Sequence, residues 1–396
     1  MNSIKKSSKI NLLFVTNSLK RRGAEQQLFN FIKELPENFD ISIYRFSNDD
    51  REFPELFRYE KVKIYSNKHI GTFNFFKFKS LYGCISDRNF DVIITLGLGA
   101  ALFLGRLCAI LKRVKIVYSI LNTYENFNKL PLKRNNYFDI FNKVINSIIP
   151  FLPGERSFRF LPNSQKLAER IKKCEDRYSI IVFYNGISKN ELEKNLSRHP
   201  DHKTKDIQRR LNGFPTIVQV GALDETKNQQ FSLGCLDEIK SKIPNVRFLL
   251  IGKGCDRNKL SSLVSTKGWE NHVIFAGHLN MIDCLYLIKH STLLVLTSLS
   301  ESFPNVLLEG QALAKPVVTF DVGAASEIVK NGITGFVIAK GDRSEFIRSA
   351  TQILINSSLA NKMGTEGMNR ALTIFSMRRK VNHFISMAEK DLSMFR

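Results

Sequence analysis

The sequence predicts an α/β protein built from two doubly wound domains, each a parallel sheet with helices on both faces. Short apolar runs rich in β-branched residues alternate with helical stretches, which is the pattern of βα units around a parallel sheet. The 396 residues are enough for two domains of ordinary size, each with its own core. A polar, charge-dense stretch at residues 188–210 divides the strand candidates into two series and is the expected interdomain linker.

The strand candidates are short apolar runs bounded by polar or turn residues. In the first half of the chain they span residues 10–15, 41–46, 92–96, 116–120 and 180–183. In the second half they span residues 216–220, 248–251, 273–275, 293–296 and 317–320. We therefore expect a first domain over residues 1–187 and a second over residues 211–375, with ligand bound beyond the carboxyl ends of the strands.

A helix is expected directly after the first strand. Its apolar face is formed by residues at helical spacing, namely Ala24, Leu28, Phe31, Ile32 and Leu35. Gly23 stands at the turn before this helix, where a backbone without a side chain can approach a ligand closely. The alternative is an ordinary structural turn, because glycine punctuates turns in general.

The composition is that of a soluble globular protein, with 43% hydrophobic and 24% charged residues. The six cysteines are scattered without a CxxC pair, which argues against a disulfide framework or a zinc site and predicts reduced thiols. The first apolar run, residues 10–15, is too short for a signal peptide. The longest one, residues 92–105, falls short of the roughly 20 residues of a membrane-spanning helix. We therefore expect a cytoplasmic protein.

The net charge of +22 predicts anionic partners such as lipid headgroups, nucleic acid or phosphorylated substrates. Residues 1–185 hold 31 Lys and Arg against 17 Asp and Glu, so most of the surplus lies there. Basic and aromatic residues interleave at 72–83 and at 128–153, and the second stretch has the apolar face of a helix that could lie in a membrane interface. A core-facing helix fits that pattern equally well. Nucleic acid is the weaker alternative, because no recognised binding motif accompanies the charge.

Residues 298–316, SLSESFPNVLLEGQALAKP, carry the most specific chemistry of the chain. An apolar run leads into a turn with Glu301, and a helix is expected to open at Pro304 and to carry Glu309 on its second turn. A helix N-terminus after a strand favours phosphate, and two glutamates beside it suit hydroxyl groups. The pattern therefore predicts a nucleotide-sugar site. The alternative is an ordinary strand–helix unit with a solvated acidic loop.

The spacing E-x7-E of these glutamates, followed by AxxxPVV, resembles the signature of retaining glycosyltransferases of family 4 with the GT-B fold. The resemblance continues downstream through Asp321, Gly323, Glu327 and Gly335, and it covers nearly the whole chain. It implies two Rossmann-like domains that face each other across a cleft, the first binding the acceptor and the second the nucleotide sugar. It also implies that the last helix, residues 376–396, crosses back to the first domain.

The resemblance implies a role for residues across the second domain. The acid equivalent to Glu301 contacts the donor sugar, Lys227 clamps the diphosphate, and the acid equivalent to Glu309 binds the ribose hydroxyls. We expect Glu301 and Lys227 to be the catalytic pair. The further donor-binding positions are those of the glycine turns and of the helix start, Gly23, Gly221, Gly277, Ser302, Phe303, Pro304, Asn305, Val306 and Leu307.

The chain departs from the family pattern at several positions. Only Gly23 is kept of a double-glycine loop, and Leu121 stands where relatives often carry histidine or arginine. That change leaves the neighbouring Asn122 as the expected acceptor contact. Ala222 replaces the arginine that usually joins Lys227 on the diphosphate, and Lys253 or Arg22 is a candidate substitute.

Two turns have equally good local explanations. Residues 163–164 resemble a family "NS" turn but also suit a helix N-cap, and residues 185–186 form an Asn-Gly turn signal found in any protein.

Together these features predict a retaining glycosyltransferase that moves a sugar from a UDP- or GDP-sugar to a lipid-linked glycan of a bacterial surface polysaccharide, such as O-antigen or capsule. The chain has no Asp-x-Asp motif and no His/Cys cluster, so we expect metal-independent transfer without a cofactor. We also expect peripheral contact with the inner face of an anionic plasma membrane. The alternatives are a nucleotide-sugar epimerase of the same fold and a nucleotide-sugar-binding protein that has lost catalysis.

Overall fold

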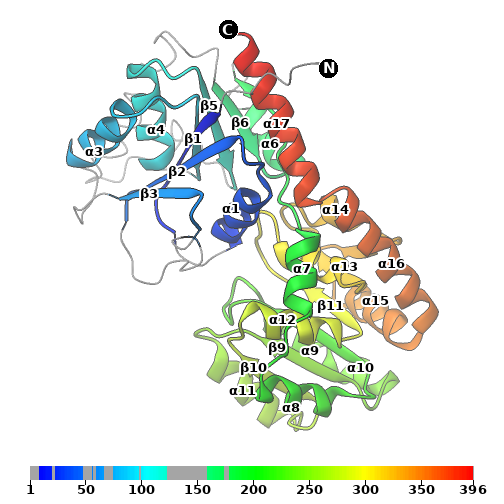
Figure 1. Ribbon diagram of the computed structural model, residues 1–396. Coiled ribbons are helices and arrows are strands. Elements are labelled where there is room, and N and C mark those ends of the chain that lie inside the picture. The colour runs from blue at the N-terminus through cyan, green and yellow to red at the C-terminus, as the bar shows by residue number, and fades with distance from the viewer. Residues whose placement is uncertain are drawn as a thin grey trace. The chain divides into compact units, whose positions relative to one another are not determined.

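The computed structural model describes residues 9–19, 23–47, 56, 59–66, 75–97, 100–122, 158–173 and 178–395. The chain divides into two compact units. The first consists of Met1–Tyr184 and Lys380–Arg396, and the second of Asn185–Arg379. Figure 1 shows the elements of both units with the labels used below.

The first unit is a parallel sheet with helices on both faces (Figure 1). Its described strands lie in the order β3-β2-β1-β4-β5-β6-β7. Leu13 packs into a core formed with α3, α4 and α6, whereas the neighbouring Phe14 contacts Phe31 of α1 on the other face. The elements are β1 (Ile10–Thr16), α1 (Gly23–Glu34), β2 (Phe39–Arg45), β3 (Val62–Ser66), α3 (Phe75–Ser86), β4 (Val92–Leu96), α4 (Ala100–Leu111), β5 (Ile116–Leu121), β6 (Phe158–Pro162), α6 (Gln165–Lys172) and β7 (Ser179–Ile180).

The second unit is a parallel sheet in the strand order β10-β9-β8-β11-β12-β13. One large apolar core lies against this sheet and includes Phe248, Trp269 and Phe346. The elements are α7 (Lys189–Leu196), α8 (His202–Leu211), β8 (Thr216–Val220), α9 (Gln229–Gly234), α10 (Leu236–Lys242), β9 (Arg247–Ile251), α11 (Arg257–Thr266), β10 (Val273–Gly277), α12 (Met281–Lys289), β11 (Leu293–Leu296), α13 (Asn305–Ala312), β12 (Val317–Phe320), α14 (Ala325–Ile328), β13 (Gly335–Ile338), α15 (Arg343–Ile355) and α16 (Ser357–Thr373).

The expected linker is not a linker in the structure. Residues 188–210 lie within the second unit and form α7 and most of α8. Both helices have side-chain N-caps, Ser188 for α7 and Asp201 for α8. Helix α7 packs on α12, and α8 packs on α12 and β10. The charged residues that suggested a linker are the solvated faces of these two amphipathic helices.

The last helix, α17 (Met377–Ser393), belongs to the first unit from Lys380 onward. Asp391 accepts hydrogen bonds from the Tyr118 hydroxyl at 2.7 Å and from Arg159 Nε at 2.7 Å and Nη2 at 2.5 Å. About two turns upstream on the same helix, Phe384 packs edge-on against Phe31, with ring centroids 5.2 Å apart. The end of the chain is therefore joined to β5, β6 and α1 by both polar and aromatic contacts.

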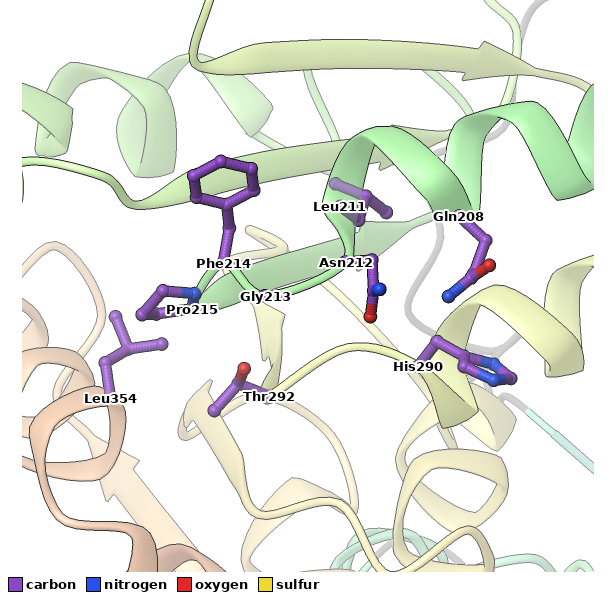
Figure 2. A pocket seen from close by; sticks show the side chains of 9 residues that line it. All are labelled: Gln208, Leu211, Asn212, Gly213, Phe214, Pro215, His290, Thr292 and Leu354. Atoms are coloured by element: carbon purple, nitrogen blue, oxygen red, sulfur yellow. The ribbon is translucent and has the colours of Figure 1, made fainter.

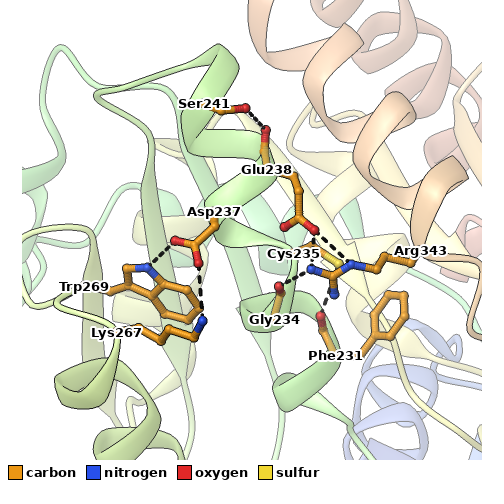
Figure 3. Close-up of polar contacts among 9 residues, drawn as sticks. All are labelled: Phe231, Gly234, Cys235, Asp237, Glu238, Ser241, Lys267, Trp269 and Arg343. Carbon is orange, nitrogen blue, oxygen red and sulfur yellow. Dashed lines mark hydrogen bonds and ion pairs between the residues drawn. The ribbon is translucent and has the colours of Figure 1, made fainter.

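A polar cluster fastens α10 to its neighbours in the second unit, as Figure 3 shows. Trp269 Nε1 donates to Asp237 at 2.7 Å, and Arg343 at the start of α15 pairs with Glu238 at 2.6 Å. These contacts join α10 to α15 and to the turn after α11, and they serve the packing of this unit.

Candidate functional site

The carboxyl ends of the strands of the second sheet are lined by short loops that contact one another. Gly252, directly after β9, has a φ of +146°. A Cβ at this position would lie 1.8 Å from the carbonyl oxygen of Gly221, the residue that follows β8. Next to this contact, the N–H of Leu223 donates to the carbonyl of Lys253 at 3.1 Å. Only glycine allows the β8 and β9 loops to touch so closely.

An ion pair at this edge joins the two residues that were predicted to act together. Lys227 Nζ lies 2.5 Å from Glu301 Oε1, and the Ser298 hydroxyl donates to the same oxygen at 2.8 Å. The side chain of Glu301 is 13% exposed and that of Lys227 is 26% exposed, so the pair is accessible from one side. The β8 loop thus supplies the cation, and the β11 loop supplies the anion.

The backbone holds this pair in place. Asp224 accepts the N–H of Lys227 at 3.0 Å, and the N–H of Leu299 donates to the carbonyl of Thr226 at 2.8 Å. The β8 loop then turns through Asn228, which has a left-handed φ of +52° and whose carbonyl accepts the Thr297 hydroxyl at 3.0 Å. Several bonds between the two loops therefore fix the position of Lys227 opposite Glu301.

Helix α13 begins beside the pair, one residue later than predicted. Pro304 is its N-cap and supplies no side-chain hydrogen bond to the first turn. Asn305 accepts a hydrogen bond from the Asn185 side chain at 2.9 Å. An uncapped helix start offers backbone N–H groups and the positive end of the helix dipole to an anion.

Gly323 closes the loop after β12 onto the loop that carries Glu301. Its φ is +53°, and a Cβ there would lie 2.2 Å from the carbonyl oxygen of Glu301. The N–H of the next residue, Ala324, donates to the carbonyl of Ser302 at 2.9 Å. The glycine of the downstream motif is thus required by close backbone packing beneath the site.

Glu309 lies on the second turn of α13, as predicted. Burial raises the pKa of its carboxyl to about 7. Its charge also acts on the Cys284 thiol of α12, whose pKa is raised first by burial and then by Glu309. A carboxylate held between α12 and α13 is suited to accept hydrogen bonds from neutral hydroxyl groups.

We expect nucleotide affinity to depend on pH through Glu309. Because the ionised form accepts hydroxyl hydrogen bonds and the pKa lies at about 7, affinity should rise as pH increases through 7 and be about tenfold weaker at pH 6 than on the plateau. Titration calorimetry with a nucleoside diphosphate from pH 5.5 to 8.5 measures this slope. Glu309→Gln should remove the step centred near pH 7 and leave only the titration of the nucleotide's own phosphate. A wild-type slope that persists in this variant would contradict the assignment.

Two of the predicted site residues, Gly23 and Asn122, lie in the first unit. Gly23 begins α1. Asn122 follows β5, and its side chain accepts a hydrogen bond from Asn163 at 3.1 Å. Leu121 is fully buried in the core, so its side chain is a packing residue. Ser164, and not Asn163, caps α6 by accepting the N–H of Leu167 at 3.1 Å. Arg22 and residues 128–153 lie outside the described residues, as do residues 72–74 of the other aromatic stretch.

The structure adds Ser298 and Asn185 to the predicted set. Ser298 orients Glu301, and Asn185 orients the first residue of α13. The serine is inside the motif that drew attention to the site, so its hydroxyl was a signal that could have been used. Asn185 lies 120 residues from Asn305, and its local Asn-Gly sequence suggested only a turn.

A hollow lies at the opposite edge of the same sheet. It has a volume of about 310 Å³ and opens where β8 and β11 begin, next to Pro215 and Thr292 (Figure 2). The side chains around it are mostly neutral and include His290 and Leu354. None of the predicted site residues lines this hollow.

Two family profiles match consecutive parts of the chain. The family described as "Glycosyltransferase Family 4" matches residues 21–191, and the one described as "Glycosyl transferases group 1" matches residues 201–370. The chain belongs to the GT-B glycosyltransferases of the family 4 type. The predicted resemblance is therefore confirmed.

Curated relatives of this family match the chain over part of its length. EpsD of Bacillus subtilis is 30% identical over 178 residues, which are 45% of this chain and 46% of EpsD. The capsular polysaccharide biosynthesis glycosyltransferase CapM of Staphylococcus aureus is 28% identical over 207 residues, which are 51% of this chain and 52% of CapM. The chain thus spans about half the length of these glycosyltransferase relatives.

A solved structure has the same fold over nearly the whole chain. The chain is similar to Anabaena Alr3699/HepE in complex with UDP, with a TM-score of 0.76, 18% identity, and coverage of 96% of this chain and 100% of that one. At this identity the likeness concerns the fold. It confirms the prediction of a GT-B α/β protein with two Rossmann-like sheets.

Proposed function

We propose that the chain is a retaining glycosyltransferase that moves a sugar from a nucleoside diphosphate sugar to a lipid-linked glycan during surface polysaccharide biosynthesis. The observation that carries the proposal is the Lys227–Glu301 pair beside the start of α13, with Glu309 one turn further along the helix. A cation and a helix N-terminus suit the diphosphate, while two carboxylates suit sugar and ribose hydroxyls. CapM, named for capsular polysaccharide biosynthesis, supports the pathway, and HepE, solved with UDP-glucose, supports a UDP-sugar donor.

The reaction would proceed as a front-face displacement. The bond between the anomeric carbon and the diphosphate oxygen breaks, and the acceptor hydroxyl attacks from the side that the diphosphate leaves. The departing phosphate oxygen takes the acceptor proton, so no separate general base is required. Lys227 and the α13 amides would stabilise the negative charge that develops on the leaving diphosphate. Glu301 would hold both Lys227 and the donor sugar.

Lys253 is proposed to replace the missing arginine at Ala222. It is exposed in the β9 loop, whose backbone is hydrogen-bonded to the loop that contains Ala222. Lys253→Ala should weaken nucleoside diphosphate binding about tenfold, the value of one charge-assisted hydrogen bond. Lys240→Ala removes an equal charge from α10 and should leave the dissociation constant unchanged, as measured by titration calorimetry. Equal losses of nucleotide affinity in both variants would show that Lys253 acts only through general electrostatic attraction, which would contradict the proposed contact with the diphosphate.

Membrane contact and metal-independent transfer remain part of the proposal. No helix among the described residues is long and apolar enough to span a membrane. The surplus of basic residues in 1–185 supports contact with an anionic lipid surface, where a lipid-linked acceptor would be held. Fixed cations and the dipole of α13 would neutralise the diphosphate in place of a divalent metal.

The test of the proposal is an assay with purified protein, a panel of UDP- and GDP-sugars and an extract of lipid-linked glycans. We expect nucleotide release that depends on both substrates, and an anomeric configuration that matches the donor by NMR. A changed sugar nucleotide formed without any acceptor would identify an epimerase instead. Nucleotide binding without turnover would identify a protein that binds donor but has lost catalysis, and inverted product would contradict retention.

A further inference from the structure

A lysine from α8 stands over the outer strand of the second sheet, at the same edge as the Lys227–Glu301 pair. The Nζ of Lys203 lies 3.8 Å from the point that a Cβ on Gly277 would occupy, and Gly277 is the last residue of β10. Among the described residues, none forms a hydrogen bond or an ion pair with this ammonium group. A donor-only group on an exposed side chain thus lies beside the backbone at the end of β10.

The start of α8 is fixed in this position by polar contacts. Asp201 caps the helix by accepting the N–H of Thr204 at 2.6 Å, and its own N–H donates to Asp283 Oδ1 at 3.0 Å. Asp283 is buried on the first turn of α12, where Asn280 donates to its other oxygen at 2.5 Å. The first turns of α8 and α12 are therefore tied together, which limits where the stem of Lys203 begins.

The sheet order gives the distance from the phosphate end of the site to this lysine. From β11, which precedes Glu301, the sheet passes through β8 and β9 to β10. Three strand spacings amount to about 14 Å, which is comparable to an extended nucleoside diphosphate. Glu309 on α13 acts on Cys284 of α12, and α12 packs on both α13 and α8. A ribose held by Glu309 would therefore lie between the two ends of this path. A diphosphate at the start of α13 would thus place its base near Gly277 and Lys203.

We propose that Lys203 contacts the base of the donor and selects a base with a carbonyl oxygen at C4 of a pyrimidine or C6 of a purine. An ammonium group only donates, so it pairs with the O4 of uracil or the O6 of guanine, and it opposes the amino group that cytosine or adenine carries at the equivalent carbon. The inference rests on the proposed function, because it assigns the base end of the same donor site.

UDP and CDP test this proposal, since they differ at the ring edge that the lysine would contact and share ribose and diphosphate. The wild-type protein should bind UDP at least about tenfold more tightly than CDP by titration calorimetry, the value of one charge-assisted hydrogen bond. Lys203→Met should remove most of that preference by weakening the binding of UDP. The binding of inorganic pyrophosphate should be unchanged. Lys203→Arg should retain the preference. If the protein prefers GDP, the matched pair is GDP and ADP.

Lys205→Met, a lysine removed from the same helix two residues away, is the control and should leave the UDP-to-CDP ratio unchanged. Equal weakening of UDP, CDP and pyrophosphate in Lys203→Met would overturn the proposal, because it would mean that Lys203 attracts phosphate. An unchanged ratio in Lys203→Met would overturn it as well. A wild-type protein that binds pyrophosphate but no nucleotide, or binds neither, would overturn the proposed donor site itself.

Discussion

Replacing Glu301 with glutamine should lower the turnover number of sugar transfer about 100- to 1000-fold, the range found when one preorganised electrostatic group is removed. The amide keeps the size of the side chain but loses the negative charge that pairs with Lys227 at 2.5 Å and accepts from Ser298. Lys227 would then have no anionic partner to hold it at the leaving diphosphate. The loss should fall on turnover and only weakly on nucleotide affinity, because Glu301 contacts the sugar in the proposed mechanism.

Initial rates and calorimetry on the same preparations separate these two effects. Glu345→Gln is the matched control, because Glu345 lies on α15 of the same unit and pairs with the exposed Arg348. It should leave the turnover number unchanged. A Glu301→Gln enzyme that works within twofold of the wild-type rate would show that this carboxylate is a packing residue of the loop.

Replacing Asp391 with alanine should destabilise the first unit by about 3–5 kcal/mol, the cost of removing one partner of a buried ion pair. Asp391 is 5% exposed and is bonded to both Tyr118 and Arg159. Burial, and then the hydrogen bond to Asp391, raise the pKa of the Tyr118 hydroxyl, so this proton stays in place at physiological pH. Without the carboxylate, the fully buried hydroxyl and the guanidinium lose their shared acceptor.

Urea unfolding followed by circular dichroism measures this loss. Glu389→Ala removes an exposed carboxylate from the same helix and should change the free energy of unfolding by less than about 0.5 kcal/mol, as surface substitutions usually do. If Asp391→Ala lowers the free energy of unfolding by less than about 1 kcal/mol, the Asp391 contacts are worth no more than a surface salt bridge. The aromatic contacts of Phe384 would then account for the packing of α17 on the first unit.

Most of the sheet strands could be predicted because buried parallel strands read as continuous apolar runs. The runs at 92–96, 216–220, 293–296 and 317–320 coincide with β4, β8, β11 and β12. Strands β3, β6 and β13 were missed. In β3 a lysine interrupts the apolar pattern at the sheet edge, β6 ends at a proline, and β13 has four residues and begins with a glycine. Their strand character comes from pairing with neighbours, which a local pattern does not contain.

The site was predictable where its residues are adjacent in sequence. Glu301, Glu309 and the start of α13 lie within one strand–loop–helix unit, so local rules place them together. Lys227 was predicted as a diphosphate clamp, but its direct ion pair with Glu301 joins positions 74 residues apart. Lys203 gave no signal, because a lysine near a helix start looks like any solvated lysine until α8 is folded onto β10. Such contacts depend on tertiary packing alone.

The proposed function requires that a nucleotide-sugar donor bind at the carboxyl edge of the second sheet. Thermal unfolding of the purified protein in EDTA, with UDP, GDP, CDP, TDP or no ligand, measures this binding. A ligand at about 100 times its Kd should add roughly 2.7 kcal/mol of stability, because it binds only the folded protein. We predict that one of these nucleotides raises the midpoint and that Glu309→Ala abolishes the shift. A shift of equal size in Glu309→Ala, or no shift with any nucleotide even after Mg²⁺ is added, would contradict the claim.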